Sequence, residues 1–490
     1  MDYLVASGRK DVAIGIYQAQ LLRFHLFKAH QRQVKLLQLN YDRLAHSASA
    51  SAGVYDDEFI NMFDYYQKAT DVKAELTTIG MVRPGNALIE PAGIEGDIQA
   101  YNYRENGQLM RQVRLDAHTN AVVYVLVPNA LGQVVETDTY DVRGFKSRVS
   151  LRNAAGKPLA DEYYTPAGEL AMRIDFAADQ AGEIEKITLK DGREFSSMQA
   201  LQCDFLMQFN QGDARFFFDD AYPLEALRLP LAHKIVVLHR DHRRPQSAEA
   251  QILRAVQDSD AEVDAIMVST PAQAQDVQTL CPEVPVVAIP AGINQEPLKP
   301  TAWATHERKT LVAVTAITPE SGIDAVIDAF IELRTHFPQL KLEVYGAALR
   351  KQDQQFLHRL KMRLQEAKAT SAVAFRGYRE DLQAVYAHAG LLLVTTPTEG
   401  FSLPIQQAMA QGLPTVAYDV AYGAQELIVD GKNGYLVSDK HASGLVGVIW
   451  PLLNDRPRHE ALSQGCHELA PRYNQDKVWQ AYCELPGGEL

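Results

Sequence analysis

The sequence is poor in cysteine and has no long hydrophobic run. Its 490 residues include only 4 cysteines, and none of them has a CxxC or metal-site spacing. We therefore expect reduced thiols in a cytosolic compartment. No stretch of about 18 apolar residues is present, and the opening residues, MDYLVASGRKDV, lack the apolar core of a signal peptide. The sequence predicts a soluble, cytoplasmic protein with at most peripheral membrane contact.

Positive charge is also scarce. The chain has 48 lysines and arginines against 61 aspartates and glutamates, a formal net charge of −13. Binding to nucleic acid or to an anionic membrane needs basic patches, so we expect neither as a general partner. One local basic stretch is present, HRDHRR at His239–Arg244. The content of 47% hydrophobic residues excludes a disordered chain, and the length predicts roughly two to four domains.

Apolar runs that alternate with helix-length segments dominate both ends of the chain. Near the N-terminus, DYLVA and VKLLQLN flank residues with helical spacing, and the pattern returns over residues 214–292 and after residue 308. Nearly continuous hydrophobic strands of this kind form parallel sheets covered by helices. A polar stretch, Asn294–Arg308, separates the last two series. We expect an α/β chain with two Rossmann-like lobes facing a cleft, which would hold a ligand.

Residues 101–195 have a different pattern, in which polar and apolar residues alternate and glycines recur at a fixed interval. The glycines on this twelve-residue lattice are Gly132, Gly144, Gly156, Gly168 and, two periods later, Gly192. Short strands broken by glycine turns predict an antiparallel meander. A sheet of this kind buries one face and must pack on another domain or chain. We interpret it as a structural insert, and docking of a partner subunit or an acceptor is the alternative.

A candidate ligand-binding turn begins the segment TEGFSLPIQQAMAQGLPTVAYD, which reads as strand end, turn, helix, turn and strand. The glycine in the turn lets the backbone approach a ligand closely. The backbone N–H groups at the start of the helix form a suitable anion site. The residues of this turn are Glu399, Gly400, Phe401, Ser402 and Leu403. In a simpler interpretation, Glu399 is an acidic residue favoured by the helix dipole.

The C-terminal part of the chain resembles the donor-binding core of the family 4 retaining glycosyltransferases, which have the GT-B fold. The resemblance rests on residues 399–437, with further matches at AIPAG (Ala288–Gly292), VYGA (Val344–Ala347) and FRGY (Phe375–Tyr378). The middle region and the stretch FINMFDYYQ resemble a bacterial subgroup with a β-rich domain inserted in the first lobe. That subgroup includes poly(glycerol-phosphate) α-glucosyltransferases and two-subunit O-GlcNAc transferases of serine-rich surface proteins.

This resemblance implies a division of the chain into five segments. The first lobe would occupy residues 1–75 and 206–300, interrupted by the β-rich insert over residues 76–205. The C-terminal, donor-type lobe would occupy residues 301–470. A C-terminal helix over residues 471–490 would cross back to the first lobe, with Trp479 as its anchor.

The resemblance also implies a donor site that has lost several residues. In the family, an Arg and a Lys neutralise the diphosphate of the donor, while one acid contacts the sugar and a second acid holds the ribose. Here Ala316 and Ser321 stand at the cation positions and Gln407 at the second acid, whereas Glu399 and Gly346 are kept. Without both cations the phosphate charges are uncompensated, and we find no metal-ligand cluster that would replace them. We expect a disabled donor site.

Two histidines in VVLHRDH are candidates for the acceptor side of the cleft. The resemblance places His239 and His242 near the acceptor, where they would form hydrogen bonds. His239 and Glu399 would be the catalytic residues if any chemistry survives. Alternatively, both histidines are loop residues beside a solvated run of charges.

Three functions are compatible with these observations. The first is a non-catalytic or weakly catalytic GT-B subunit that stabilises an active paralogous glycosyltransferase and holds a Ser/Thr-rich polypeptide. The second is an active retaining transferase that uses a UDP-sugar donor on protein serines or wall teichoic acid. The third is a carbohydrate-binding or secretion-accessory module. We favour the first, because three losses converge on one ligand.

Overall fold

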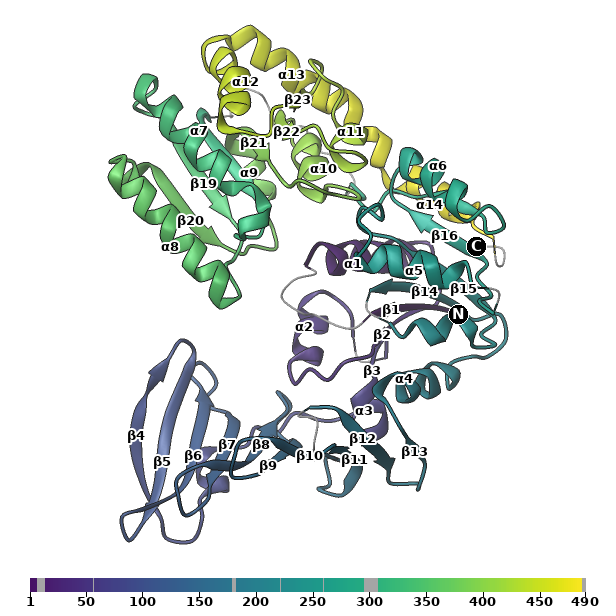
Figure 1. The fold of residues 1–490 in the computed structure, drawn as a ribbon, viewed down its shortest axis with the longest axis vertical. Helices are drawn as coiled ribbons and strands as arrows, with labels where there is room; N and C mark the ends of the chain where they lie inside the picture. Colours follow the sequence, from purple (N-terminus) through teal and green to yellow (C-terminus); the bar gives the residue numbers. More distant parts are fainter. Residues whose placement is uncertain are drawn as a thin grey trace. The chain divides into compact units, whose positions relative to one another are not determined.

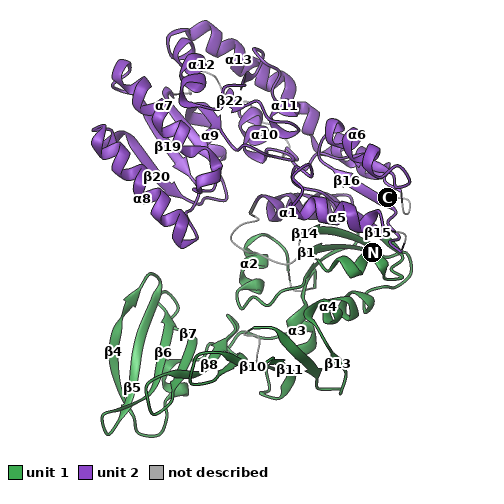
Figure 2. Cartoon of the chain, viewed as in Figure 1, with its two compact units in different colours: residues 1–10, 31–233 green, residues 11–30, 234–490 purple. Residues whose placement is uncertain are grey.

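The computed structural model divides into two compact units. The first unit is formed by residues 1–10 and 31–233, and the second by residues 11–30 and 234–490 (Figure 2). The structure describes residues 1–6, 14–55, 57–178, 182–220, 222–258, 260–294 and 307–486. Most of the linker predicted at Asn294–Arg308 lies outside these ranges. Within them, no helix combines the length and the apolar character needed to cross a bilayer.

The first unit contains parallel strands in the order β14-β1-β2-β3. Their apolar side chains, such as Leu4, Leu36 and Phe217, are buried, as expected for strands covered on both faces. The elements of this part are β1 (Asp2–Ala6), β2 (Val34–Gln38), α2 (Ala45–Ser51), β3 (Phe59–Asn61), α3 (Met62–Gln67), α4 (Met198–Met207), β14 (Arg215–Asp220) and η2 (Leu224–Arg228).

The stretch FINMFDYYQ forms the strand β3 and the short helix α3. Asn61 starts α3, because its Oδ1 accepts a hydrogen bond from the backbone N–H of Phe63 at 2.9 Å. Lys68 ends the helix in the left-handed conformation, with φ of 55°. These two caps limit the helix to Met62–Gln67.

Between β3 and β14 in the sequence, the first unit forms a ten-stranded antiparallel sheet, in which each strand pairs with the next one along the chain (Figure 1). The strands are β4 (Leu88–Glu95), β5 (Ile98–Glu105), β6 (Gln108–Asp116), β7 (Val122–Pro128), β8 (Val134–Tyr140), β9 (Lys146–Arg152), β10 (Pro158–Tyr164), β11 (Leu170–Phe176), β12 (Ile184–Leu189) and β13 (Glu194–Phe195). The predicted meander is therefore confirmed, and it begins one strand earlier than expected. All five lattice glycines have positive φ and lie between strands.

One of these glycines is constrained by its surroundings as well as by its backbone angle. Gly144 has φ of 102°, and a Cβ atom there would lie 1.9 Å from the carbonyl oxygen of Glu75. We expect Gly144→Ala to destabilise the first unit by several times the roughly 1–2 kcal/mol that a left-handed alanine costs alone. Gly156→Ala is the matched control, because φ is 78° there and no atom lies within 4 Å of the added Cβ. Hydrogen exchange of the β8 and β9 amides would measure both; equal effects would contradict the prediction.

The sheet is covered partly by its own unit. At one end, the short turn η1 (Ile79–Val82) packs on a cluster that includes Tyr103, Val113 and Val125. Further along, the Gln67 side chain of α3 donates hydrogen bonds to the carbonyl oxygens of Ser147 at 2.8 Å and of Tyr164 at 2.7 Å. The expected cover on one face is thus supplied at these two places by neighbouring segments of the same unit.

Buried charges join the meander to the helices of the first unit. Arg143 donates from Nε to Asp141 at 2.6 Å, from Nη2 to Asp64 of α3 at 2.9 Å and from Nη1 to the carbonyl oxygen of Ala69 at 2.5 Å. His46 Nε2 lies 2.6 Å from the other oxygen of Asp64. The side chains of Arg143 and Asp64 are each only 8% exposed. This group, His46, Asp64, Asp141 and Arg143, is the buried charge cluster.

The second unit begins with a helix that packs against elements far along the chain. Its first elements are α1 (Ile14–Ala29), β15 (His233–Val237), α5 (Ala248–Val256), β16 (Ala265–Val268), α6 (Pro271–Leu280) and β17 (Val286–Ala288). The strands β15, β16 and β17 are parallel neighbours. The helices α5 and α6 each begin with a side-chain cap. The Ser247 side chain accepts a hydrogen bond from the backbone N–H of Ala250, and the Thr270 side chain accepts one from the backbone N–H of Gln273.

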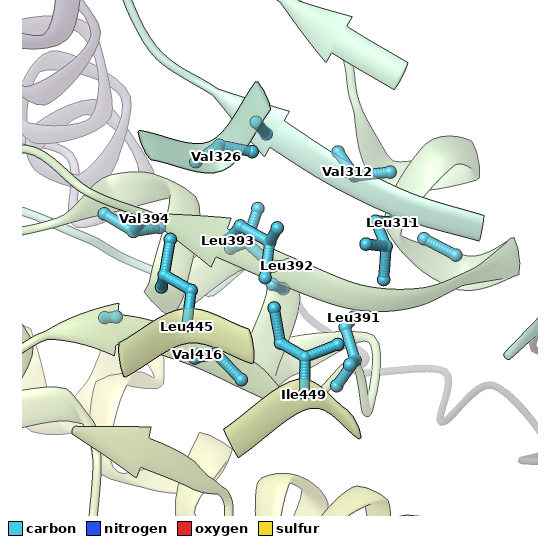
Figure 3. Packing of buried hydrophobic residues seen from close by; sticks show 14 of the residues in the cluster. Leu311, Val312, Val326, Leu391, Leu392, Leu393, Val394, Val416, Leu445 and Ile449 are labelled. Carbon is cyan, nitrogen blue, oxygen red and sulfur yellow. The ribbon is translucent and has the colours of Figure 1, made fainter. Parts of the chain in front are cut away.

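A six-stranded parallel sheet, in the order β20-β19-β18-β21-β22-β23, forms the largest part of the second unit. Its elements are β18 (Glu307–Val314), η4 (Pro319–Ser321), α7 (Ile323–His336), β19 (Lys341–Tyr345), α8 (Lys351–Glu366), η5 (Thr370–Ala372), β20 (Val373–Gly377), α9 (Gln383–His388), β21 (Ala389–Val394), α10 (Leu403–Ala410), β22 (Thr415–Tyr418), α11 (Gly423–Leu427), β23 (Gly434–Val437), α12 (Ala442–Asn454), α13 (Arg456–Leu469), η6 (Ala470–Tyr473) and α14 (Gln475–Cys483). The central strand β21 is buried along its length, and Leu391 to Val394 pack between the helices, with Val326 of α7 and Leu445 of α12 beside them (Figure 3). The strand pattern predicts this parallel sheet, and the prediction is confirmed.

The last helix, α14, packs on the first helix of the same unit. Trp479, the expected anchor, stacks on His30 with ring centroids 4.1 Å apart and an interplanar angle of 3°. It also meets the edge of Phe27 at 5.7 Å. Nearby, Arg23 Nε of α1 donates a buried hydrogen bond to the Tyr482 hydroxyl at 2.9 Å. Residues near the two ends of the chain are thus held together.

Candidate functional site

A cavity of about 480 Å³ lies within the second unit. It is lined by residues that follow β15, β18, β19, β20 and β21, together with the first turns of α1 and α10. The carboxyl ends of parallel strands meet at one edge of a sheet, which is where ligands bind in open α/β proteins. The volume is in the range of cavities that hold a small organic ligand.

Most of the site residues chosen from the sequence are in the lining of this cavity. They are His239, Ala316, Ser321, Gly346, Glu399, Gly400, Phe401, Ser402, Leu403 and Gln407. His242 is not in the lining, although it is only three residues from His239. The structure therefore brings the expected donor-side positions together and separates the two histidines.

Two glycines in the lining are required by close backbone contacts. A Cβ atom on Gly400 would lie 2.2 Å from the carbonyl oxygen of His239. Gly346 has φ of 146°, and a Cβ atom there would lie 1.8 Å from the carbonyl oxygen of Thr315. These contacts fix the turns that follow β19 and β21, and they bring the loop after β15 against the turn before α10.

The start of α10 faces the cavity without a side-chain cap. Ser402 occupies the N-cap position, and its side chain accepts no capping hydrogen bond. The N–H groups of a first helical turn have no partner inside the helix. Ser402 and Leu403 are both in the lining, so this helix end is available to an anion.

The family resemblance implies cations at residues 316 and 321, and neither residue in this lining is basic. Ala316 follows β18, and Ser321 is buried, with its hydroxyl donating to the carbonyl oxygen of Thr318 at 2.8 Å. Three arginines that the sequence did not assign to the donor site are present instead: Arg240, Arg244 and Arg379. The first two belong to the basic stretch HRDHRR, and Arg379 directly follows the FRGY motif.

Comparisons with known proteins concern the family and the fold of this chain. Residues 295–467 match the model of the family described as glycosyl transferases group 1. The chain superposes on the crystal structure of the pneumococcal O-GlcNAc transferase GtfA in complex with UDP and GlcNAc with a TM-score of 0.82, at 20% identity, over 98% of this chain and 97% of that one. Residues 295–467 therefore resemble a group 1 glycosyltransferase domain, and the chain has the GT-B fold.

Two curated relatives match along nearly the whole length of the chain. It is 26% identical to the GtfA subunit of a UDP-N-acetylglucosamine-peptide N-acetylglucosaminyltransferase of Streptococcus gordonii, over 99% of this chain and 97% of that one. It is 22% identical to a poly(glycerol-phosphate) alpha-glucosyltransferase of Bacillus subtilis, over 97% of this chain and 73% of that one. A structure of the GtfA/B complex also has this fold, with a TM-score of 0.68 at 21% identity, over 99% of this chain and 98% of that one.

Glu399, the acidic residue of the turn before α10, has its carboxylate inside the protein. Oε2 is inaccessible to solvent and lies beside Gly423, where an added Cβ would approach it to 3.3 Å. Burial raises the pKa of the Glu399 carboxyl, and the nearby hydroxyls of Ser402 and Thr396 partly oppose this shift. The folded protein therefore holds this proton more tightly than the unfolded chain does.

The raised pKa of Glu399 predicts a pH-dependent stability. Above the ordinary value of 4.5, the unfolded chain loses this proton while the folded chain keeps it, so the free energy of unfolding falls as the pH rises towards the folded pKa. The slope for one proton is at most about 1.4 kcal/mol per pH unit. We expect Glu399→Gln, which is neutral at every pH, to lack this decrease in melting curves recorded from pH 4.5 to 8. An identical pH dependence in the two proteins would contradict the prediction.

His242 has a supporting position behind the cavity. It is buried, and its ring stacks on Tyr422 with centroids 5.9 Å apart. Burial lowers the pKa of His242, which favours the neutral ring. Arg243 lies over the same tyrosine ring at 4.6 Å, and the Tyr422 hydroxyl donates to Asp276 at 2.6 Å. The loop after β15 is therefore held against α6 and the residue before α11.

Tyr422 is also held in an uncommon backbone conformation. Its φ and ψ are 75° and −90°, although it is neither glycine nor asparagine. A backbone bridge joins it to Glu399. The contacts of its buried ring with His242, Arg243 and Asp276 offset this strain and keep the Glu399 turn in place.

A metal ion is not supported by the side chains of the site. Across the described parts of the chain, no three His, Cys, Asp or Glu side chains gather as metal ligands. Any phosphate charge in the cavity would therefore meet arginine side chains and backbone N–H groups among the described residues.

Proposed function

We propose that this chain is a non-catalytic or weakly catalytic subunit of a glycosyltransferase complex, which stabilises an active paralogue and binds its acceptor. The observation that carries the proposal is the presence of Ala316 and Ser321 in the cavity lining. A diphosphate leaving group develops negative charge, and removing one group that stabilises such charge costs about 10²–10³ in rate. Loss of two cations accordingly makes transfer by this chain slow.

The partner in this proposal is a paralogous catalytic subunit. Relatives described as subunits of a peptide N-acetylglucosaminyltransferase and the GtfA/B complex of the same fold support a paired assembly. The acceptor would be a Ser/Thr-rich polypeptide, with teichoic acid as the alternative, and the assembly would act in the cytoplasm or at the membrane surface. The meander is the candidate surface for docking the partner or the acceptor.

A second candidate is an active retaining transferase with a UDP-sugar donor. It is favoured by the cavity itself, which keeps Glu399, Gly346 and Gly400. Glu399 would then contact the transferred sugar, and His239 would lie at the acceptor side. In this alternative the UDP-sugar is a substrate that the three lining arginines would have to accommodate.

Co-expression with a paralogue that carries the Arg, the Lys and both acids tests the proposal. We expect the two chains to co-purify, and we expect the isolated chain to release UDP from UDP-GlcNAc or UDP-glucose at least about 100-fold more slowly than the complex. Failure to co-purify would overturn the pairing. UDP release by the isolated chain at the rate of the complex, abolished by Glu399→Gln, would favour the active transferase.

A further inference from the structure

We infer that Arg244 and Arg379 are the cations of a retained binding site for a phosphate ester of a sugar or nucleoside. They line the cavity from different segments: Arg244 follows β15 and Arg379 follows β20. Neither arginine stands at the cation positions that Ala316 and Ser321 occupy here. The positive charge in this cavity therefore comes from other parts of the lining. The inference rests on the proposed function, because a subunit that transfers no sugar can still hold a phosphorylated ligand.

The first argument is that both arginines are available to a ligand. Neither forms an ion pair or a side-chain hydrogen bond with another described residue, and both side chains are exposed at the cavity. Arg240, in contrast, lies 3.8 Å from Glu249. An arginine guanidinium presents a planar set of donors that matches the oxygens of a phosphate.

The second argument concerns the acidic residues around these arginines. Glu320 lies 3.7 Å from Arg350, which offsets its charge. Burial raises the pKa of Glu399, so this side chain opposes an anion less than an exposed carboxylate would. Glu380 is in the lining as well and would repel an anion, so we expect both arginines to be needed.

The third argument is that a buried polar group in the lining lacks a partner. The Tyr386 hydroxyl is on a residue only 1% exposed, and it has no hydrogen bond with a described residue. Buried polar atoms are rarely left unpaired, and an exception points to a ligand. Together with the uncapped start of α10, this hydroxyl offers a donor to phosphate oxygens or to the hydroxyls of a sugar.

Calorimetry on the full chain tests the inference with four probes: UDP, inorganic pyrophosphate, glycerol 3-phosphate and uridine. We expect UDP and pyrophosphate to compete for one site and uridine to bind at least about tenfold more weakly than UDP. Arg244→Gln and Arg379→Gln should each weaken UDP binding about tenfold or more. The matched control is Arg376→Gln, because Arg376 lies three residues from Arg379 but outside the lining, paired with Glu343 at 2.6 Å.

The possible results separate the ligand sources and the two proposals. Arginine-dependent binding of glycerol 3-phosphate without UDP binding would also support the site and assign it to a glycerol phosphate chain. No binding of any phosphate at millimolar concentration, or binding that both arginine variants leave unchanged, would overturn the inference. Co-purification with the paralogue does not depend on these probes, so the proposed function and the site fail independently.

Discussion

We expect a triple variant to bind UDP about 100-fold more tightly than the natural chain. Its substitutions are Ala316→Arg, Ser321→Lys and Gln407→Glu. Ala316, Ser321 and Gln407 all line the cavity, so the new side chains would reach the space in which we expect phosphates and ribose. A hydrogen bond to a charged group contributes about 1.5–3 kcal/mol, and part of this gain is lost in ordering the new side chains. The measurement is calorimetry with UDP on the triple variant and on the natural chain.

A neutral variant separates charge from shape in this experiment. Ala316→Gln with Ser321→Met adds side chains of similar length without positive charge. We expect this variant to bind UDP no better than the natural chain. Equal affinity of the charged and neutral variants would contradict an electrostatic origin. It would also mean that the absence of positive charge at residues 316 and 321 does not limit the affinity for UDP.

Replacing Arg143 with Met should lower the free energy of unfolding of the first unit by about 3–5 kcal/mol. Arg143 is the cation of the buried charge cluster, where it pairs with Asp64 and Asp141. Its removal leaves Asp141 without this partner, and Asp64 with only His46 beside it, in a site that is almost closed to water. Breaking a buried pair in this way costs more than the pair contributes, because the remaining charge is left without compensation.

Native-state hydrogen exchange of the amides in α3 and β9 would measure this loss in the full chain. Arg104→Met is the matched control, because its partner Glu90 is 53% exposed and surface pairs contribute at most about 1 kcal/mol. The double variant Arg143→Met with Asp141→Asn should recover part of the stability, since one stranded charge is removed. No recovery would indicate that the cost of Arg143→Met comes from lost packing.

The fold class could be predicted from the sequence because its signals are local and repeated. The apolar strand GLLLVTT becomes β21, buried along its whole length, and the glycine lattice marks turns with positive φ. The bounds of the short helix α3 could not be predicted, since the caps at Asn61 and Lys68 leave no mark on the hydrophobic pattern. The cover of the meander could not be assigned either, because the contacts of Gln67 with Ser147 and Tyr164 join distant residues.

The candidate site could be predicted where its residues end neighbouring parallel strands. Ala316, Gly346 and Glu399 follow β18, β19 and β21, so the topology alone brings them to one edge. Arg244 and Arg379 were missed because they are more than a hundred residues apart and match no family position. Only the structure shows that they line one cavity. These residues, unlike the strand ends, have no periodic signal.

The packing of α14 on α1 has a consequence for the order in which the chain folds. Trp479 stacks on His30, yet the whole first unit apart from its opening strand is synthesised between these two residues. At a ribosomal rate of roughly 5–20 residues per second, α14 is synthesised roughly 20–90 s after α1. Meanwhile its apolar residues, among them Phe27, are without their final cover. During that interval the face of α1 that α14 later covers remains exposed, so the second unit is completed only after the first unit has been synthesised.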